Sequence, residues 1–416
     1  MIRGPMPQPA RCLPARRGAA PRGRSRDRFA RAAAAVALAA LAVGAGGCDA
    51  ARDPEDALPP VRIGAVYNLT GSQAALDVPA ARGAQLAADE ANRAGGVGGR
   101  AVELLVEDGR SDAGGVADAA RRLLDRHSDL VALVGLSDTD MVLAAAPVAA
   151  RAGLLFLTSG ATSPRLPSQA AGDVFLAGFG DNVQAAAAAE WAHGDRGART
   201  AAILYDASSS YTTLLQGYFA QRFEQLGGRV VAVRGYAPAD LLAAIDSAPS
   251  ADVVFFAAMP EQVGPGATRL RRGGFDGPIL GGDSYDSDAV WREHPELAGV
   301  FFTTHAFLGA DDADPRAAAF RGAYAAAHGG ATPDAFAGLG YDTVKLLLAA
   351  VADAGSVEPA AVRDALAAVR GFVGVTGTLA YPEGGRVPVK SVVVLEGHRG
   401  ERRLVRSLAP TQVPAP

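Results

Sequence analysis

The chain has 416 residues, of which 49% are hydrophobic and 20% charged, a composition typical of soluble globular proteins. Its net charge of −4 is spread along the sequence, which argues against a nucleic-acid-binding groove. Both cysteines, Cys12 and Cys48, precede the first predicted strand. The folded part therefore has no disulfide framework, no thiolate metal site and no cysteine nucleophile.

The N-terminus is predicted to be a targeting segment. Residues 1–31 are rich in arginine, the apolar run 32–45 follows, and Gly46 and Gly47 lead into Cys48. A basic region, a short apolar region and small residues are typical of a secretory signal over residues 1–47. Cysteine after small residues resembles the bacterial lipobox, so we expect lipidation at Cys48 and export to the periplasmic face of the inner membrane or the cell surface. The alternative is a plain signal peptide with an incidental cysteine. The acidic, proline-containing residues 48–60 are expected to form a tether.

The rest of the chain alternates short apolar strands with helices. The first series predicts strands over 61–67, 101–107, 130–134 and 154–157, and helices over 78–93, 112–127 and 139–152. The second predicts strands over 200–205, 229–233, 252–257 and 278–281, and helices over 211–225, 238–246 and 260–272. The chain then continues with a strand over 299–304, helices over 315–328, 335–354 and 358–369, and a strand over 387–395.

This alternation predicts an α/β fold with parallel sheets covered on both faces. The two series are separated near residues 178–181, so we expect two doubly wound, flavodoxin-like sheets. Ligands of such sheets bind beyond the carboxyl ends of the strands. The loops of interest therefore follow Tyr67, Val134, Leu157, Tyr205, Ala257 and Gly281.

A family resemblance is carried by the segment from Gly64 to Asp108. Its characteristic positions are Leu69-Thr70-Gly71, Gly83, Glu90, Asn92, Gly95-Gly96, Gly99-Arg100 and Glu107-Asp108. The segment resembles the N-terminal signature of the branched-chain amino acid (Leu/Ile/Val)-binding proteins of ABC transporters. The likeness continues through residues 130–166, 200–219 and 278–288, and it covers nearly the whole mature chain.

The resemblance implies the type I periplasmic-binding fold, in which three crossover strands join two lobes. The first lobe is expected to hold residues 61–179 and about 306–375, the second 180–305 and about 376–405, and the tail 406–416. It also implies a monomer that takes a small amino-acid-like ligand between the lobes and works with an ABC permease and ATPase. The alternative is a ligand-sensing module of the same fold for amides or small organic acids.

Two segments are suited to a ligand carboxylate, because amides and hydroxyls at a helix N-terminus favour an anion. The resemblance places contacts at Thr139, which opens the helix 139–152, and at Gly160 and Thr162 in the turn after residue 157. The local alternatives are that Ser137 or Thr139 only caps the helix and that Gly160 serves only a turn.

The resemblance also assigns the ligand's ammonium to Asp283, since a buried carboxylate makes a strong charge-assisted bond. The alternative is a solvated loop aspartate beside Asp286 and Asp288. Tyr211 is expected either to line the cleft or to pack its helix. Leu76 and Met259 stand where the family has aromatic residues, so the pocket is expected to be more apolar and the ligand's side chain stays open.

No enzymatic motif is found. The six histidines are not paired at metal-ligand spacing, and the chain lacks a nucleophile elbow, a P-loop and a calcium-loop pattern. We therefore expect a binding protein that uses no cofactor and no metal.

Overall fold

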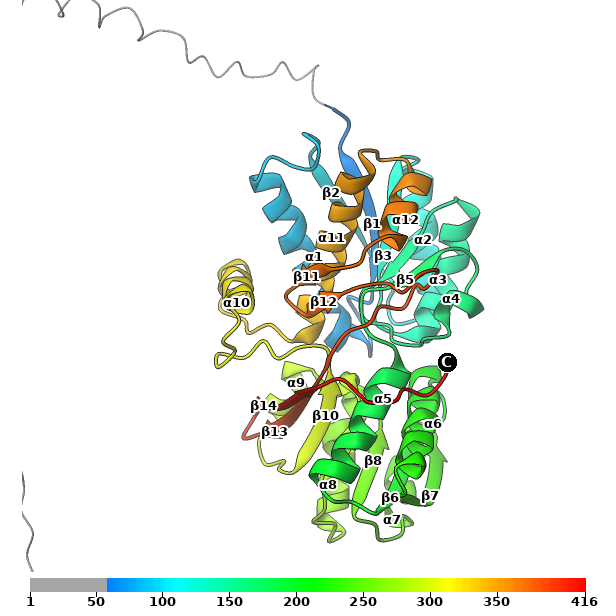
Figure 1. The fold of residues 1–416 in the computed structure, drawn as a ribbon, viewed down its shortest axis with the longest axis vertical. Coiled ribbons are helices and arrows are strands. Elements are labelled where there is room, and N and C mark those ends of the chain that lie inside the picture. Colours follow the sequence, from blue (N-terminus) through cyan, green and yellow to red (C-terminus); the bar gives the residue numbers. More distant parts are fainter. Residues whose placement is uncertain (1–57) are drawn as a thin grey trace, which may run out of the picture. The chain divides into compact units, whose positions relative to one another are not determined.

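A computed structural model describes residues 58–416 (Figure 1). The first lobe is built on a parallel sheet with the strand order β2-β1-β3-β4-β5. This order is that of a flavodoxin-like sheet. Its strands are β1 (Val61–Tyr67), β2 (Val102–Asp108), β3 (Leu130–Gly135), β4 (Phe156–Thr158) and β5 (Val174–Leu176).

Helices cover both faces of this sheet because its central strands are apolar on both sides. One face packs against α1 (Ala74–Arg93), α11 (Ala335–Ala354) and α12 (Pro359–Ala367). The other packs against α2 (Ala113–Arg126), α3 (Thr139–Arg151) and α4 (Leu166–Gln169). Asp112 caps α2, and its carboxylate accepts the Gly115 amide at 2.7 Å.

The second lobe repeats the arrangement with the order β14-β13-β10-β9-β8-β6-β7. The first five strands along the chain are parallel, whereas β13 and β14 add an antiparallel edge. They are β6 (Thr200–Asp206), β7 (Arg229–Tyr236), β8 (Val253–Ala257), β9 (Ile279–Gly281), β10 (Val300–Thr304), β13 (Val392–His398) and β14 (Glu401–Leu408). The two-lobed α/β fold expected from the sequence is thus confirmed.

The helices of the second lobe also form two layers. One face carries α5 (Asp181–Glu190), which ends in a π-helical turn, and α6 (Ser210–Gln225). The other carries α7 (Leu241–Asp246), α8 (Pro260–Arg272) and α9 (Asp288–Glu293). Helix α10 (Pro315–Ala327) packs against α1, and β11 (Phe372–Gly374) pairs with β12 (Gly377–Leu379).

The chain passes between the two sheets three times: from β5 to α5, after β10, and from β12 to β13 (Figure 1). The first passage ends at α5, a helix that the sequence analysis missed because its run of alanines has no apolar periodicity. Strand β5 was also missed, because three residues give too short a pattern.

Two further differences lie at helix and strand ends. Helix α1 begins at Ala74, four residues before the predicted start, and it accommodates Pro79 inside its first turns. The strand predicted over residues 387–395 is β13, and it begins at Val392. Strand β14 extends to Leu408, into the segment expected to be a tail.

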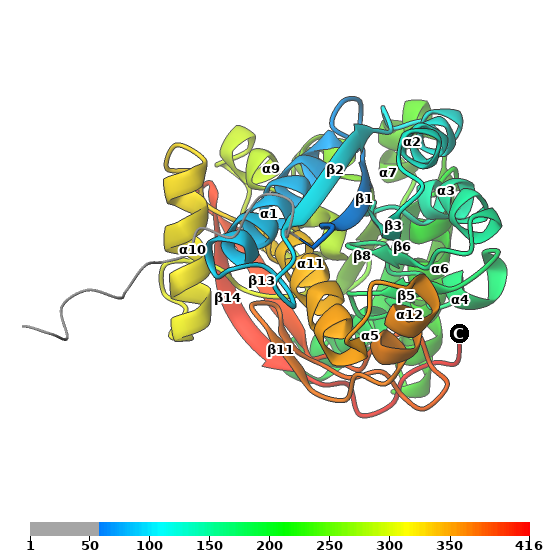
Figure 2. The same ribbon diagram turned by 90° about the horizontal axis from the view of Figure 1, so that it is seen from above.

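Helices α1 and α11 lie side by side at very short range (Figure 2). A β-carbon on Gly83 would stand 1.9 Å from the carbonyl oxygen of Ala337, and one on Gly340 would stand 1.9 Å from that of Ala80. Glycine is therefore required at both positions by close backbone approach. Helix α11 is long and apolar enough to span a membrane by composition, yet 14 of its residues are buried in the structure.

We predict that Gly83→Ala or Gly340→Ala destabilises the protein by about 1–3 kcal/mol, because the added methyl group forces α1 and α11 apart. Thermal unfolding measures the loss. The matched control is Gly322→Ala in α10, where a β-carbon meets nothing within 4 Å. There the better helix propensity of alanine should stabilise the folded protein by about 0.5–1 kcal/mol. Equal effects at all three sites would contradict the close-packing argument.

Candidate functional site

A small cavity lies between the lobes, at the carboxyl ends of both sets of parallel strands. The first lobe contributes Leu76, Ser137, Asp138, Thr162 and Phe336, and the second contributes Tyr211, Met259, Asp283 and Ser284. The cavity measures about 10 Å³, roughly the space of one water molecule. Across the cleft, the Ser210 amide donates to the Asp140 carboxylate at 3.1 Å. The lobes are therefore closed on each other.

Five of the seven predicted ligand residues line this cavity. They come from loops or helices that follow different strands: Leu76, Thr162, Tyr211, Met259 and Asp283. The loops after β1 and β3, and after β6 and β8, all contribute lining residues. These are the places where the strand order of each sheet reverses, which is where doubly wound sheets bind ligands. Direct ligand contact by the five residues stays a prediction.

Gly160 and Thr139 do not line the cavity. A β-carbon on Gly160 would stand 2.7 Å from Ser137 Oγ and 2.8 Å from Phe336 Cε1, so this glycine lets two lining side chains approach. Thr139 is buried, and its hydroxyl has no hydrogen-bond partner among the described residues. Neither Ser137 nor Thr139 caps α3, contrary to the alternative drawn from the sequence.

Asp138 is the N-cap of α3 and lines the cavity at the same time. Its Oδ1 accepts the amides of Asp140 at 2.9 Å and of Met141 at 3.1 Å. Burial, with the neighbouring Asp140 charge, raises its pKa to about 6. The helix N-terminus expected to receive a ligand carboxylate thus holds a carboxylate of the chain itself.

The turn after β4 is fixed by internal hydrogen bonds. The Thr158 hydroxyl donates to the Leu136 carbonyl at 2.8 Å and accepts the Ala161 amide at 3.2 Å. The Gly160 amide also donates to Leu136, at 3.2 Å. Leu136 itself has a φ of 57°, a left-handed conformation uncommon for a residue with a side chain. This wall of the cleft is consequently rigid, and two of its amides are already engaged.

Asp283 is 2% exposed, so it is not the solvated loop residue considered as an alternative. Its Oδ1 accepts Gln184 Nε2 at 2.9 Å and the Tyr211 hydroxyl at 2.8 Å. Its Oδ2 lies 3.0 Å from His305 Nε2. The carboxylate expected to receive a ligand ammonium therefore already has three donors from the protein.

Asp181, at the start of α5, is a second buried carboxyl in the same network. Its Oδ1 accepts Gln184 Nε2 at 3.0 Å, and its Oδ2 has no partner among the described residues. Its amide donates to the Thr162 carbonyl at 2.7 Å, which places it directly behind the cavity wall. Burial, together with the nearby Asp283 charge, raises its pKa to about 8.

His305 lies on the passage that follows β10. Its ring stacks on Phe179, from the first passage, at a centroid distance of 3.8 Å. A β-carbon on Gly178 would stand 2.8 Å from the ring, so the two passages touch closely. Complete burial lowers the pKa of His305, so the neutral ring carries its proton on Nε2 and donates it to Asp283.

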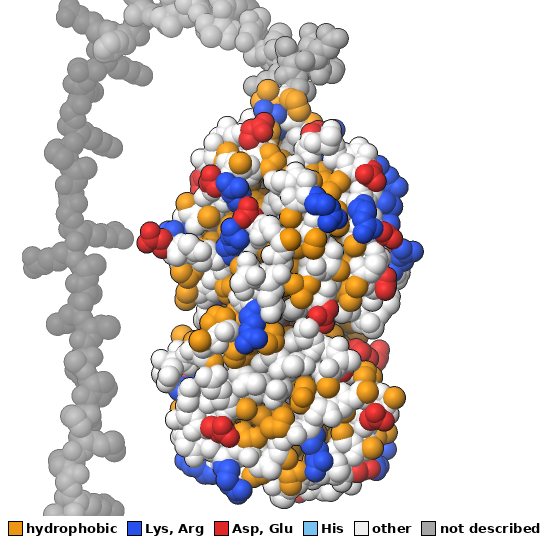
Figure 3. Space-filling model, turned by 90° about the vertical axis from the view of Figure 1, so that its right-hand side faces the viewer, with side chains coloured by type: hydrophobic (Ala, Val, Ile, Leu, Met, Phe, Trp, Pro, Cys, Tyr) orange, Lys and Arg blue, Asp and Glu red, His pale blue; other side chains and the backbone are white. Residues whose placement is uncertain are grey.

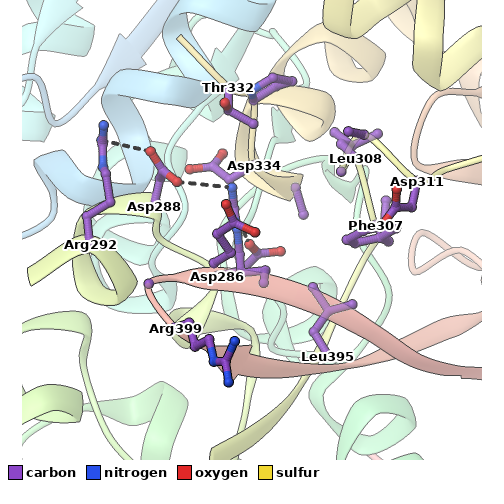
Figure 4. A pocket seen from close by; sticks show the side chains of 18 of the residues that line it. Asp286, Asp288, Arg292, Phe307, Leu308, Asp311, Thr332, Asp334, Leu395 and Arg399 are labelled. Carbon is purple, nitrogen blue, oxygen red and sulfur yellow. Dashed lines mark hydrogen bonds and ion pairs between the residues drawn. The ribbon is translucent and has the colours of Figure 1, made fainter. Parts of the chain in front are cut away.

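The acids Asp286, Asp288 and Asp334 line a second, larger cavity of about 570 Å³ (Figure 4). Asp286 is buried and accepts Arg402 Nη1 at 2.6 Å and the Thr304 hydroxyl at 2.7 Å. Asp288 pairs with Arg292 at 2.7 Å. Asp334 caps α11, and burial raises its pKa to about 7. Within residues 58–416 no three potential metal ligands come together.

Comparison with known proteins then places the chain in a family. The family model described as periplasmic binding protein matches residues 60–401. The chain belongs to this family. The resemblance to Leu/Ile/Val-binding proteins noted in the sequence is also confirmed, because relatives of that name align with most of this chain.

Among these relatives, the Leu/Ile/Val-binding protein BraC3 of Rhizobium johnstonii is 28% identical over 346 residues, which are 82% of this chain and 92% of that protein. The amino acid binding protein of Pseudomonas aeruginosa is 27% identical over 73% of this chain and 81% of its own length. The leucine-binding protein LivK of Thermotoga maritima superposes with a TM-score of 0.75 at 29% identity, covering 84% of this chain and 99% of LivK.

The isoleucine complex of LivJ from Streptococcus pneumoniae superposes with a TM-score of 0.74 at 25% identity, covering 83% of this chain and 99% of LivJ.

Several residues of the binding protein's cleft were missed by sequence reasoning. They are Ser137, Asp138, Ser284 and Phe336 in the lining, and Asp181, Gln184 and His305 behind it. Ser137, Asp138 and Ser284 lie beside residues that were chosen. Asp181 and Gln184 are three residues apart on one helix face, and that spacing is the signal by which this pair could have been found.

We predict that the ligand-free binding protein loses stability as the pH rises from about 4 through about 8. Asp181 holds its proton in the folded state up to its pKa of about 8, whereas an unfolded aspartate loses it near pH 4. Asp181→Asn cannot ionise, so the fall in the free energy of unfolding should become shallower. Urea unfolding between pH 5 and pH 9 measures it.

The control is Asp276→Asn, at an exposed acid of the second lobe. It should leave the pH dependence unchanged. Asp77 and Asp138 have pKa values raised by burial to about 7 and about 6, so part of the dependence should persist in Asp181→Asn. A slope identical to that of the unmodified protein would contradict the assignment of a buried, protonated Asp181.

Proposed function

We propose that this periplasmic binding protein is the extracytoplasmic solute-binding component of an ABC importer and that it takes an amino-acid-like solute between its lobes. The observation that carries the proposal is the cavity in which five sequence-predicted residues from both lobes converge. Its relatives are named as binding proteins, which supports a protein that captures its ligand without changing it.

The proposed ligand contacts divide into polar and apolar groups. Thr162, Tyr211 and Asp283 are the proposed polar contacts, and Leu76 and Met259 are the proposed apolar contacts. Thr139, whose hydroxyl has no partner among residues 58–416, becomes a further contact when the lobes part, and Gly160 keeps room for Ser137 and Phe336. A cavity of about 10 Å³ is too small for an amino acid, so binding requires the two lobes to move apart by bending at the three passages between them.

Figure 3 shows one face of the molecule. Basic and acidic side chains are interspersed on the face that it shows, with no concentrated patch of either sign. We propose that export uses the signal segment 1–47 and that lipidation at Cys48 holds the protein at the membrane. Both features lie outside the described residues.

We predict that an α-amino acid ligand stabilises the protein against heat. At a hundredfold excess over Kd, linkage gives about 2.7 kcal/mol. Thr162→Val removes one hydroxyl from the cavity and should weaken binding about fivefold, the effect of one neutral hydrogen bond. Thr213→Val, on the exposed face of α6, is the control and should bind as the unmodified protein does. No shift with any α-amino acid would refute the proposal.

The anchor has a separate test. Cys48→Ser should move the exported protein from the membrane fraction to the soluble fraction, because it removes the only proposed acylation site. Cys12→Ser is the matched control, since Cys12 falls within the predicted signal segment. Immunoblots of fractionated cells measure the distribution. Retention of the Cys48→Ser protein in the membrane fraction would show that another feature tethers it.

A further inference from the structure

We propose that the cleft selects a ligand of net positive charge, an α-amino acid with a second amine or a short aliphatic diamine, and that Asp181 receives the additional ammonium. The proposal rests on the proposed function insofar as it places the ligand in the cavity between the lobes. It goes further by assigning a carboxylate that the sequence did not reveal and a charge class for the ligand.

The first argument is the charge of the site. Three buried carboxyl groups lie in or directly behind the walls: Asp138, Asp181 and Asp283. The described residues that line the cavity include no arginine and no lysine. His305 touches Asp283 but is neutral.

The buried lysine nearest to this network does not compensate those acids. Lys390 directs its Nζ to the Thr376 hydroxyl at 2.7 Å and to the Ala177 carbonyl at 3.4 Å. Thr376 in turn donates to the Asp342 carboxylate at 2.5 Å. Lys390 is therefore held on the side of Asp342, away from the cavity lining.

The second argument is the balance of donors and acceptors. The donors of the walls are largely used within the protein: Tyr211 donates to Asp283 at 2.8 Å, and Ser284 donates to the Ala258 carbonyl at 2.7 Å. The α3 amides are occupied by Asp138. By contrast, Asp181 Oδ2 is a buried carboxyl oxygen without a partner among residues 58–416, and it becomes an acceptor once the carboxyl has lost its proton. The site can thus accept further hydrogen bonds more readily than it can donate them.

Ser137 gives an independent indication that a polar group is expected here. It lines the cavity, it is 9% exposed, and its hydroxyl has no partner within the described chain. Buried hydroxyls and carboxylates without a partner are costly, so native proteins supply one from protein, water or ligand. An ammonium group offers three donors, which is enough for a carboxylate and a hydroxyl together.

The structure offers one carboxylate for each of the two ligand amines. A single amide, Gln184 Nε2, bonds Oδ1 of Asp181 at 3.0 Å and Oδ1 of Asp283 at 2.9 Å. Gln184 is itself held through its oxygen by the Thr303 hydroxyl at 3.0 Å. The pair is fixed in position, with Asp283 at the second-lobe wall and Asp181 behind Thr162.

Apolar lining residues complete the description of the ligand. Leu76, Met259 and Phe336 provide surface for a short methylene chain. When no cation is bound, Asp181 keeps its proton instead of a charge, which limits the cost of its burial. A cationic ligand replaces that proton with an ammonium, and the low dielectric of the closed cleft strengthens its attraction to the carboxylate.

The test compares ornithine with norvaline, which lacks only the terminal amine, and with 1,4-diaminobutane, which lacks the carboxylate. Titration calorimetry on the folded protein should give ornithine at least tenfold tighter binding than norvaline, the effect of one charge-assisted bond. Asp181→Asn should lower ornithine affinity at least tenfold and change norvaline affinity less than twofold. Asp276→Asn, the exposed control, should change neither.

The outcomes distinguish this inference from the proposed function. Equal binding of ornithine and norvaline would overturn the inference and leave the amino-acid function standing. Binding of the diamine alone would support the inference and refute the amino-acid function. No binding of any of the three would overturn both. A preference for ornithine that survives in Asp181→Asn, and in Asp181→Ser as a second folded variant, would remove Asp181 from the site.

Discussion

The closed cleft depends on one buried carboxylate. Asp283 accepts hydrogen bonds from Gln184 on α5, from Tyr211 on α6 and from His305 on the passage after β10. These three donors come from sequence positions that span 122 residues, from 184 to 305 counted inclusively, and they meet because the parallel strands all end at the same edge. Burial makes the carboxylate costly without partners, so the three bonds reinforce one another and fix the floor of the second lobe.

Much of the fold was predictable because its strands are buried on both faces and its helices are amphipathic. Strand β1 and helices α8 and α11 were predicted at their observed bounds, since apolar runs and stop signals coincide there. Helix α5 was not, because a run of alanines carries no periodicity. Strand β14 was not, because its residues are largely exposed at the sheet edge and alternate weakly.

The site was predictable only in part, for a different reason. The chain showed which loops follow strands, the family resemblance selected seven residues in or near those loops, and five of the seven line one cavity. The orientation of a side chain within a loop depends on tertiary contacts, which the sequence does not display. Asp138 rather than Thr139 faces the cavity because its carboxylate turns back to cap α3. Asp181 becomes visible only when α5 is placed beside Asp283.

The glycine contact between α1 and α11 has a consequence for how ligand preference can change. Of the lining residues in the first lobe, Leu76 lies on α1 and Phe336 lies on α11. The backbones of these two helices are already in contact at Gly83 and Gly340. The first-lobe wall is therefore closely packed, and a helix shift cannot make room for a larger residue in place of Leu76 or Phe336. New specificity in this scaffold would arise more readily from the second lobe, where Met259 is only partly buried and can vary without disturbing a helix pair.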